Sequence, residues 1–543
     1  MKTKLHIIIL LAVFLAGCGG AGSMISQLFD YPVTEQFSFN LPAGEKYLSV
    51  TNMSASNAKL EYDFSFAQAR AQVLARAKMN IASMGFSHND GRIIKDMDAA
   101  SRFNANPPPR PAVSGPRLLR AGPASASYIV GESKSEGGFW VENNTGNFVR
   151  QSAAVRAKGS SCYIWVAGAI YTTSTSSDSD KLITSSQAQD LADKFDIIYP
   201  LCTNLLGYEY GGGLGGSGGI DGDKEIHIFV YDAGGSETGL AGYFWAKDEY
   251  PQDYLDKMGL VNSNYKGLKS NQMEIFYIDA YFLDKKPETI YSTLIHEFQH
   301  MINFNRKSME QNLASETWYN EMLSMLAEDV IAPFIGIGPG NPGHVINERI
   351  PLFLDLYWYC GVDEWLDGDD KIISYSTAYA FGAYLIRNFG GSVGGPGLIY
   401  EILNNKAVNH ASITQALQKV NNNASFTFDY ALEHYAEALV YSTSHGGIPA
   451  GKMSFEKPST SNISGKIYTA YAFDIWTTNN DPRYGYDPRS GPYIHELYYW
   501  VEAPRRSVWV HDLTKYFGAN TGTLSGTITK PSSAVIKMNI LGY

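Results

Sequence analysis

The segment from Tyr291 to Phe304 constrains the fold more than any other, because it sets two histidines and a glutamate into an apolar run. In a helix, the apolar residues of this run fall on one stripe, namely Leu294, Ile295, Phe298, Met301 and Ile302. His296 and His300 are four residues apart and therefore lie one above the other on a single face. Two imidazoles so placed can bind one metal ion, which removes the cost of burying them unpaired. Glu297 is offset around the helix, where it can polarise a water on that ion without ligating it.

A catalytic zinc ion normally has three protein ligands and one position left for water, so a third ligand is needed. A glycine at position 303 and a histidine at position 306 would extend one common motif, but the chain has Asn303 and Arg306, which excludes it. The other common solution is a glutamate on a following helix. Residues 314–329 predict such a helix, with Ser315 as its N-cap.

Two glutamates near the start of that helix are candidates for the third ligand. Glu316 would lie in the first turn, where the helix dipole favours any acid. Glu321 lies one turn further in, flanked by Trp318, Met322 and Met325, and is harder to explain as a surface residue. The residues alone leave both open and give Glu321 the stronger case.

The composition is that of a globular chain with several domains. Its 543 residues exceed what one hydrophobic core supports and indicate three or so domains. Hydrophobic residues make up 44% and charged residues 18%, an ordinary balance for such a chain. The formal net charge of -11, with no basic cluster, argues against binding of nucleic acid.

The N-terminus has the pattern of an export signal. Lys2 and Lys4 precede an apolar run, residues 5–16, that is too short to span a bilayer as a mature helix. The run ends in Leu15-Ala-Gly-Cys18, which closely resembles the lipobox of bacterial lipoproteins. The resemblance implies cleavage before Cys18, lipid attachment to that residue and a membrane anchor. No aspartate follows the cysteine, which by analogy with Gram-negative sorting favours the outer membrane or the cell surface.

Three cysteines remain once Cys18 carries lipid, in an exported and oxidising setting. We predict a disulfide between Cys162 and Cys202, which lie in the same half of the presumed catalytic domain, with Cys360 left over. None of the three has metal-site spacing, so the predicted zinc site is not a thiolate site.

Periodicity and composition divide the chain into modules. We expect a signal peptide at 1–17, a lipidated tether at 18–24, an N-terminal β-rich module at 25–103, a Pro-rich linker at 104–126, a central domain with the metal helix at 127–450 and a C-terminal all-β module at 451–543. A helix is expected at Ala67–Met84, and residues 315–440 have a mostly helical pattern. In the central domain, strands are predicted at 139–141, 162–166, 226–231, 241–245 and 273–278, with a helix at 187–206. The predicted fold class is α+β, with a mixed sheet and the metal helix followed by a mainly helical half.

A glycine-rich tract, Gly211–Gly219, leads into Asp221 and Asp223. The tract lacks the Gly-Lys-Ser/Thr ending of a phosphate loop. The aspartate pair is a candidate calcium site, but the later acidic ligands of a calcium loop are missing, so a plain turn is favoured.

The two helical segments resemble a known family. His296-Glu-Phe-Gln-His-Met-Ile-Asn-Phe304 and Thr317-Trp-Tyr-Asn-Glu-Met-Leu-Ser324 are similar to the hyicolysin-type neutral zinc metallopeptidases, within the wider thermolysin-like, glutamate-zincin group. The resemblance extends upstream to the strands at 241–244 and 274–279 and covers roughly residues 127–440. It implies a zincin fold, with zinc as the cofactor. The residues it assigns are His296, His300 and Glu321 as metal ligands and Glu297 as the general base.

One position departs from the pattern of that group. Many thermolysin-like enzymes have an acid four residues after the ligand glutamate, which orients the first histidine, and this chain has Met325 there. Glu328, two turns after Glu321 on the same face, and Asp279 are the alternatives for that contact.

A peptidase also needs a donor for the oxyanion that forms at the attacked carbonyl. The stretch Tyr379-Ala-Phe-Gly-Ala383 resembles the Tyr-x-x-Gly-Ala element that supplies a tyrosine hydroxyl in glutamate-zincin aminopeptidases. We therefore predict Tyr379 as the donor, ahead of Tyr375, His410 and His434.

Together these inferences predict a lipid-anchored, extracytoplasmic zinc endopeptidase that acts on protein or peptide substrates. The alternative is a surface lipoprotein adhesin in which the zinc site is structural or vestigial. A structural zinc ion is usually closed by four protein ligands, and no fourth ligand is apparent in the sequence.

Overall fold

The computed structural model describes residues 32–66, 93–110, 127–143, 145–173, 181–213, 216–481, 488–497 and 500–543. The predicted signal peptide, Cys18, the tether, the helix at 67–84 and most of the Pro-rich linker lie outside the described residues. Within the described part of the chain, no helix is long and apolar enough to cross a membrane. The chain divides into two compact units, Met1–Met79 with Ile494–Tyr543, and Asn80–Tyr493.

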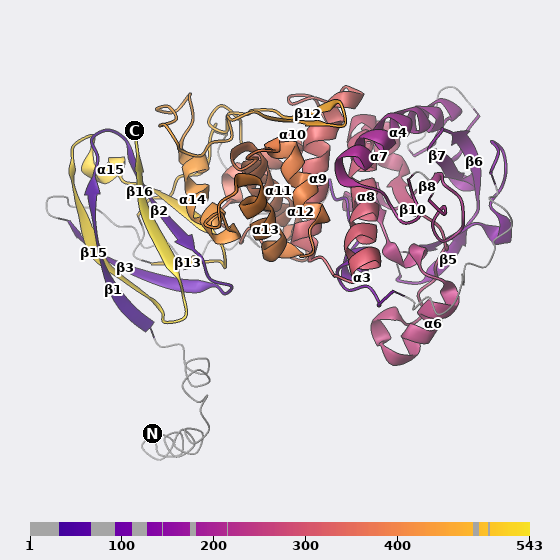
Figure 1. Cartoon of the computed structure of the whole chain (residues 1–543), viewed down its shortest axis with the longest axis horizontal. Coiled ribbons are helices and arrows are strands. Elements are labelled where there is room, and N and C mark those ends of the chain that lie inside the picture. The colour runs from indigo at the N-terminus through magenta and orange to yellow at the C-terminus, as the bar shows by residue number, and fades with distance from the viewer. Residues whose placement is uncertain are drawn as a thin grey trace, which may run out of the picture. The chain divides into compact units, whose positions relative to one another are not determined.

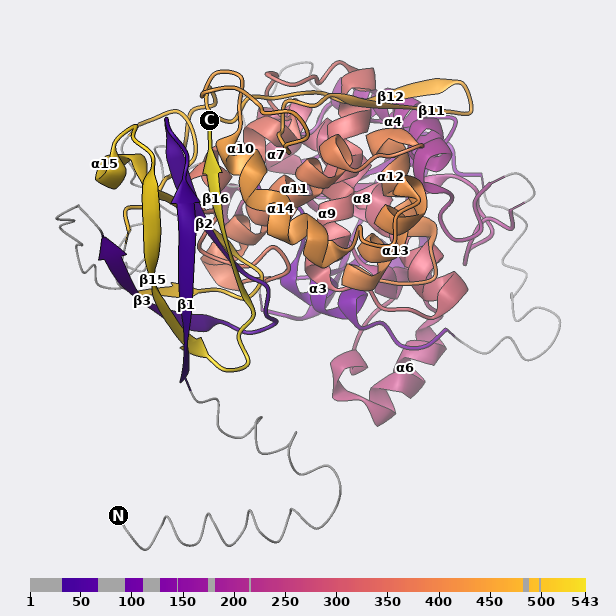
Figure 2. The same cartoon turned by 60° about the vertical axis from the view of Figure 1, so that its left-hand side comes forward.

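The first unit consists of two antiparallel sheets built from both ends of the chain (Figures 1 and 2). Its strands are β1 (Pro32–Leu41), β2 (Lys46–Asn52), β3 (Ala58–Phe66), β13 (Trp500–Ala503), β14 (Val508–Asp512), β15 (Gly522–Pro531) and β16 (Ile536–Gly542), with the short helix α15 (Thr514–Phe517). One sheet has the order β1-β15-β3-β13 and the other the order β14-β2-β16. Figure 1 shows the indigo N-terminal strands interleaved with the yellow C-terminal ones.

The N-terminal and C-terminal β modules expected as separate domains are therefore parts of one unit. Pro32 pairs with Pro531 at one end of the β1–β15 ladder, and Leu41 pairs with Gly522 at the other. Alternation of apolar and polar residues identifies a strand, but it carries no information about which distant strand completes the sheet.

The second unit has a mixed five-stranded sheet with the order β6-β7-β8-β10-β9. Its strands are β6 (Ala153–Lys158), β7 (Cys162–Ala167), β8 (Ile226–Tyr231), β9 (Gly242–Phe244) and β10 (Ile275–Asp279), and a separate hairpin pairs β4 (Phe139–Glu142) with β5 (Phe148–Gln151). The edge strand β9 runs antiparallel to β10, whereas β7, β8 and β10 are parallel.

Helices make up the rest of this unit. They are α3 (Asp98–Ala105), α4 (Ser185–Leu206), α5 (Gly235–Thr238), α6 (Gln252–Val261), α7 (Ala280–Lys285), α8 (Pro287–Asn303), α9 (Thr317–Ile331), α10 (Val345–Leu356), α11 (Lys371–Asn388), α12 (Gly394–Asn404), α13 (Asn409–Asn421) and α14 (Phe428–Val440). The predicted α+β class is confirmed, and so are the strands expected at 162–166 and 226–231 and the helix expected at 187–206.

The C-terminal boundary of the helical half differs from the expectation. Residues 451–493 belong to the second unit, where β11 (Ser459–Ile463) and β12 (Lys466–Ala470) form a hairpin. The hairpin packs on the start of α12, because Ser459 Oγ and Ser461 Oγ accept hydrogen bonds from the Gly395 and Gly397 amides at 2.7 Å each.

The predicted disulfide is wrong. Cys162, on β7, and Cys202, on α4, are both free, as is Cys360. All three side chains are fully buried, and a buried free thiol behaves as a small hydrophobic residue. Burial raises the pKa of each thiol, and for Cys360 to about 12, so none is poised for thiolate chemistry.

The aspartate pair after the glycine-rich tract forms a turn. Asp221 Oδ1 accepts a hydrogen bond from the Asp223 amide at 2.9 Å, and Asp223 Oδ1 accepts one from the Glu225 amide at 3.2 Å. Asp221 Oδ2 also lies 3.2 Å from His227 Nε2. These local contacts account for the pair as a turn, the interpretation that the sequence favoured.

Candidate metal centre

Helix α8 presents both histidines of the motif to the interior. Pro287 occupies its first turn, where a proline costs no hydrogen bond, and Glu288 places an acid beside the positive end of the helix dipole. The five predicted stripe residues are all fully buried. Helix α8 packs against α4 and α9, which fixes its rotation and points His296 and His300 towards α9.

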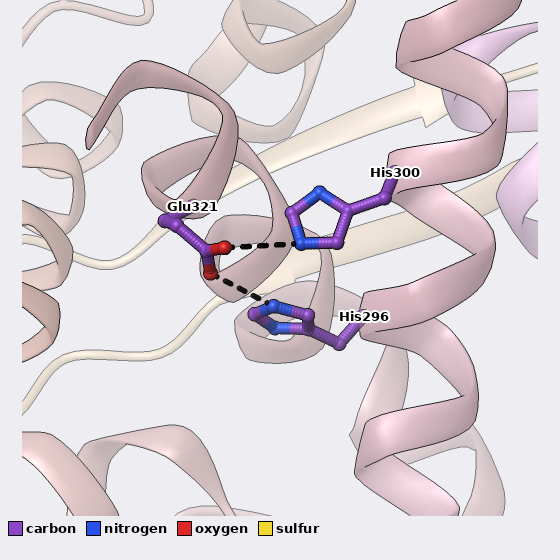
Figure 3. Close-up of side chains that lie close together, drawn as sticks. All are labelled: His296, His300 and Glu321. Atoms are coloured by element: carbon purple, nitrogen blue, oxygen red, sulfur yellow. Dashed lines mark hydrogen bonds and ion pairs between the residues drawn. The ribbon is translucent and has the colours of Figure 1, made fainter. Parts of the chain in front are cut away.

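Helix α9 supplies the carboxylate opposite the histidines (Figure 3). Glu321 Oε2 lies 3.0 Å from His296 Nε2, and Glu321 Oε1 lies 3.3 Å from His300 Nε2. Within the described residues, this trio is the one group of three or more histidine, cysteine or acidic side chains whose ligand atoms all lie within 4.8 Å of one another. Glu316 lies elsewhere, since its carboxylate accepts hydrogen bonds from Trp318 Nε1 and Asn409 Nδ2 at 2.7 Å each.

The second nitrogen of each histidine also has a partner on α9. His296 Nδ1 lies 2.7 Å from Glu328 Oε1, and His300 Nδ1 lies 3.0 Å from Ser324 Oγ. Because an ionised carboxylate only accepts hydrogen bonds, His296 would donate from Nδ1 to Glu328 when a metal ion takes its Nε2. Glu321, Ser324 and Glu328 thus act from one face of a single helix.

The choice between Glu328 and Asp279 is decided by these contacts. Asp279 caps helix α7, where its carboxylate accepts hydrogen bonds from the amides of Phe282, Ala233 and Gly235 at 2.9 to 3.1 Å. Glu328 therefore makes the contact with His296 that an acid at position 325 makes in many thermolysin-like enzymes.

Glu297 lies buried next to this cluster with neither carboxylate oxygen hydrogen-bonded to a described residue. Burial, followed by the negative charges of Glu321 and Asp96, raises the pKa of Glu297 well above its usual range, while Lys95 opposes this shift. A carboxyl group with a raised pKa is suited to accept a proton and release it again near neutral pH.

A model of the Peptidase M30 family matches residues 143–463, more than half of the chain. The chain belongs to the Peptidase M30 family. The neutral metalloprotease ShpI of Staphylococcus hyicus is 26% identical to it over 297 residues, which are 51% of this chain and 56% of that protein. The chain therefore spans little more than half the length of this relative. The hyicolysin-type resemblance seen in the sequence is confirmed.

The M30 region contains all three members of the histidine–glutamate cluster, but two charged residues at the centre lie outside it. Lys95 Nζ contacts Glu328 Oε2 at 2.5 Å and Glu348 Oε2 at 3.3 Å, and all three side chains are buried. Asp96 is 6% exposed, and its electrostatic neighbours include Glu321 and His300. Sequence reasoning missed both, because residues 93–97 show neither periodicity nor a motif.

The tyrosine predicted as the oxyanion donor is engaged elsewhere. Tyr379 Oη donates a hydrogen bond to Asp329 Oδ2 at 3.0 Å, and Arg387 pairs with the same carboxylate at 2.9 Å. Tyr375, one helical turn earlier, is fully buried, and its hydroxyl has no hydrogen-bond partner among the described residues. Burial, then Glu321 and Asp96, raise the pKa of Tyr375 well above its usual range, which places its hydroxyl within the field of the cluster.

The two histidines named as further donor candidates also have other contacts. His410 Nε2 lies 3.0 Å from Asp363, and its ring stacks on Trp318 at 5.1 Å between centroids. His434 Nδ1 lies 3.2 Å from Glu437 Oε1 on the same helix.

The donor set of the M30 cluster fits a zinc ion. Two imidazole nitrogens and one carboxylate are the ligands of many catalytic zinc sites, and they leave a coordination position open. Both Nδ1 atoms are held by hydrogen bonds, so each Nε2 is oriented before any metal arrives.

Proposed function

We propose that this chain is a zinc endopeptidase in which Glu297 is the general base and His296, His300 and Glu321 hold the metal. The observation that carries the proposal is the buried carboxylate of Glu297 beside the cluster, whose two oxygens have no hydrogen-bond partner in the part of the chain that the structure describes. A buried carboxylate without a partner destabilises a protein if its role is purely structural. It is expected where the carboxylate has to contact a water and a substrate. Membership in the M30 family and similarity to a relative named a neutral metalloprotease support it.

The residues of the centre divide the reaction between them. When bound, a zinc ion would lower the pKa of a water and polarise the carbonyl of the peptide bond. Glu297 takes a proton from the attacking water, and its raised pKa lets it carry that proton until the leaving amine accepts it. Tyr375 is our choice for the oxyanion donor, because its hydroxyl bonds to no described residue and can donate to the carbonyl oxygen as that oxygen becomes negative.

The test compares Glu297→Gln with Glu288→Gln, an exposed glutamate on the same helix. With zinc bound, we expect Glu297→Gln to lose about 100- to 10,000-fold in hydrolysis of casein, the usual contribution of a general base. Both variants should retain about one equivalent of zinc, and Glu288→Gln should keep wild-type activity. Casein hydrolysis by Glu297→Gln at the wild-type rate would disprove the role of Glu297. If the zinc-loaded wild-type protein and all of its variants are inert on several unfolded substrates, the adhesin is favoured.

We also propose that the protein is a lipoprotein of the outer membrane or cell surface, anchored through Cys18. The lipobox-like sequence that ends at this residue supports the proposal. Replacing Cys18 with Ser should move the protein from the membrane fraction to the soluble fraction. An unchanged distribution would rule out the lipid anchor.

A further inference from the structure

The β9 edge of the five-stranded sheet is bordered by a segment from outside the M30 region, residues 93–110, which we call the strap. Strand β9 pairs with β10 on one side only. Just before β9, Ile94 forms a parallel bridge with Leu240: the Ile94 amide donates to Gly239 O at 2.9 Å, and Ile94 O accepts from the Ala241 amide at 2.7 Å. The strap thus continues the backbone hydrogen bonding of the sheet just before β9.

Further along the strap, the side chain of Asn104 makes the two hydrogen bonds that the backbone of a paired strand would make. Asn104 Nδ2 donates to Phe244 O at 2.8 Å, and Asn104 Oδ1 accepts from the Ala246 amide at 2.9 Å. Phe244 O is at the end of β9 and the Ala246 amide lies just past it, so an extended peptide added along this edge would compete with Asn104 for these groups. With Ile94 and Asn104 in place, these edge groups are already bonded.

Aromatic contacts hold the strap down. Phe103 is 5% exposed, and its ring meets those of Tyr250 and Tyr265 edge-on at 5.9 and 5.8 Å between centroids. The same two tyrosines donate hydrogen bonds to strap carbonyls, Tyr265 to Asn106 O at 2.9 Å and Tyr250 to Pro108 O at 2.7 Å.

The residues of the centre are buried, and the strap residues Lys95 and Asp96 are among their neighbours. Glu297 and His296 are fully buried, and Glu321 and His300 are 2% and 4% exposed. A cavity of about 600 Å³ lies nearby, but its lining includes Ile94, Asp96 and other strap residues and none of the three ligands. A peptide cannot reach Glu297 in this conformation.

Charge adds to the covering. Lys95 lies between the buried carboxylates of Glu328 and Glu348, so a strap that leaves deprives both of their cation. Asp96 Oδ2 is buried with no hydrogen-bond partner among the described residues, next to the ligands Glu321 and His300. With a divalent cation between those ligands, its negative charge would be attracted to the centre.

We propose that this edge of the sheet is where a peptide binds, and that the strap is an intramolecular inhibitor, which bonds the edge before β9 and at its end and must leave it before a peptide reaches Glu297. This inference rests on the proposed peptidase function. Substrate then binds only the open fraction of molecules, so the apparent affinity falls by that fraction and rises when the strap is weakened. Lys95 is left unchanged in the test, because it also holds Glu328.

The test uses the full-length, zinc-loaded protein and two variants, Asn104→Ala and Phe103→Ala. Asn104→Ala removes two hydrogen bonds that the strap makes with the sheet edge, which should raise kcat/KM on a fluorogenic peptide by about tenfold. Both variants should also release zinc faster to excess EDTA. Arg102→Ala, an exposed position on the same helix, is the control and should match wild type in both measurements.

The possible outcomes distinguish a failure of the inhibitory role of the strap from a failure of the proposed peptidase function. Values of kcat/KM and zinc release at or below wild type in Asn104→Ala, with an unchanged melting temperature, would overturn the inhibitory role. Phe103→Ala is judged in the same way if it remains folded. If zinc-loaded wild type and variants cleave nothing, the peptidase function fails, and the rate of zinc release alone then decides whether the strap covers the centre.

Discussion

Glu321 links the two helices of the metal centre, since each of its oxygens faces a different histidine. Glu321→Ala removes the anionic ligand and leaves two neutral ones, so zinc affinity should fall by orders of magnitude. Because metal stabilises only the folded site, the melting temperature of this variant should stop rising with added zinc. Isothermal titration with zinc and a thermal shift series measure the two effects.

Glu316→Ala is the matched control for this variant. Its carboxylate contacts Trp318 and Asn409, so we expect a loss of about 0.3–1 kcal/mol from the helix end and normal zinc binding. If the Glu321 variant retained zinc and the Glu316 variant lost it, Glu321 would not be the third ligand and Glu316 would take that role.

Replacement of the two tyrosines of α11, Tyr375 and Tyr379, should affect activity and stability differently. Tyr375→Phe removes a buried hydroxyl that no described residue uses, so stability and zinc content should hold while kcat falls by about 100- to 1,000-fold. Tyr379→Phe removes a donor to Asp329 and should cost about 1–3 kcal/mol of stability with little change in kcat. Steady-state kinetics and urea unfolding of both variants check this. A Tyr375 variant with normal kcat would exclude it as the donor.

The case of these tyrosines shows what sequence leaves open at the level of single residues. Tyr375 and Tyr379 are four apart and so lie on one face of α11, where either would suit the pattern. What separates them is Asp329 on α9, which bonds Tyr379 and Arg387. That contact depends on the register of two packed helices, and no local pattern encodes it.

At the scale of elements, α9 acts as a single support for both histidines. The positions of Glu321, Ser324 and Glu328 along α9 put them on one face and could be predicted from the helical period. The choice of Glu328 over Asp279 and the contact of Ser324 with His300 could not, because they depend on how the π-helical turn at Phe304–Met309 and the segment after it return the chain to α9.

Glu328→Ala tests this supporting role. The variant frees His296 Nδ1 and removes one of the two carboxylates paired with Lys95, so zinc affinity should fall by about 10- to 100-fold. Glu328→Gln keeps an acceptor for His296 and should lose less. Zinc titration of both variants measures these affinities. Wild-type zinc affinity in Glu328→Ala would show that the contact between Glu328 and His296 does not affect metal binding.

At the scale of the whole molecule, the metal helix and its sheet could be predicted well, because their signals are local. The motif, the apolar stripe of α8 and the buried strands β7 and β8 each fall within one short segment. The first unit was divided wrongly because its strands pair across almost the full length of the chain, as Thr34 with Thr529. The strap escaped notice for the same reason, since its partners lie more than a hundred residues away on the sheet.

Truncation after Tyr493 tests the pairing of the chain ends. In the sheet orders, β15 separates β1 from β3, and β2 lies between β14 and β16, so this truncation takes every sheet partner from β1, β2 and β3. Unpaired strands cannot satisfy their backbone groups, and residues 32–66 should become sensitive to trypsin. Zinc binding should persist, because all three ligands belong to the other unit.

Removal of β16 alone, by ending the chain at Ala534, is the control, since β2 then keeps β14 and residues 32–66 should stay largely protected. Protection of residues 32–66 after the longer truncation would mean that the N-terminal strands form a module of their own.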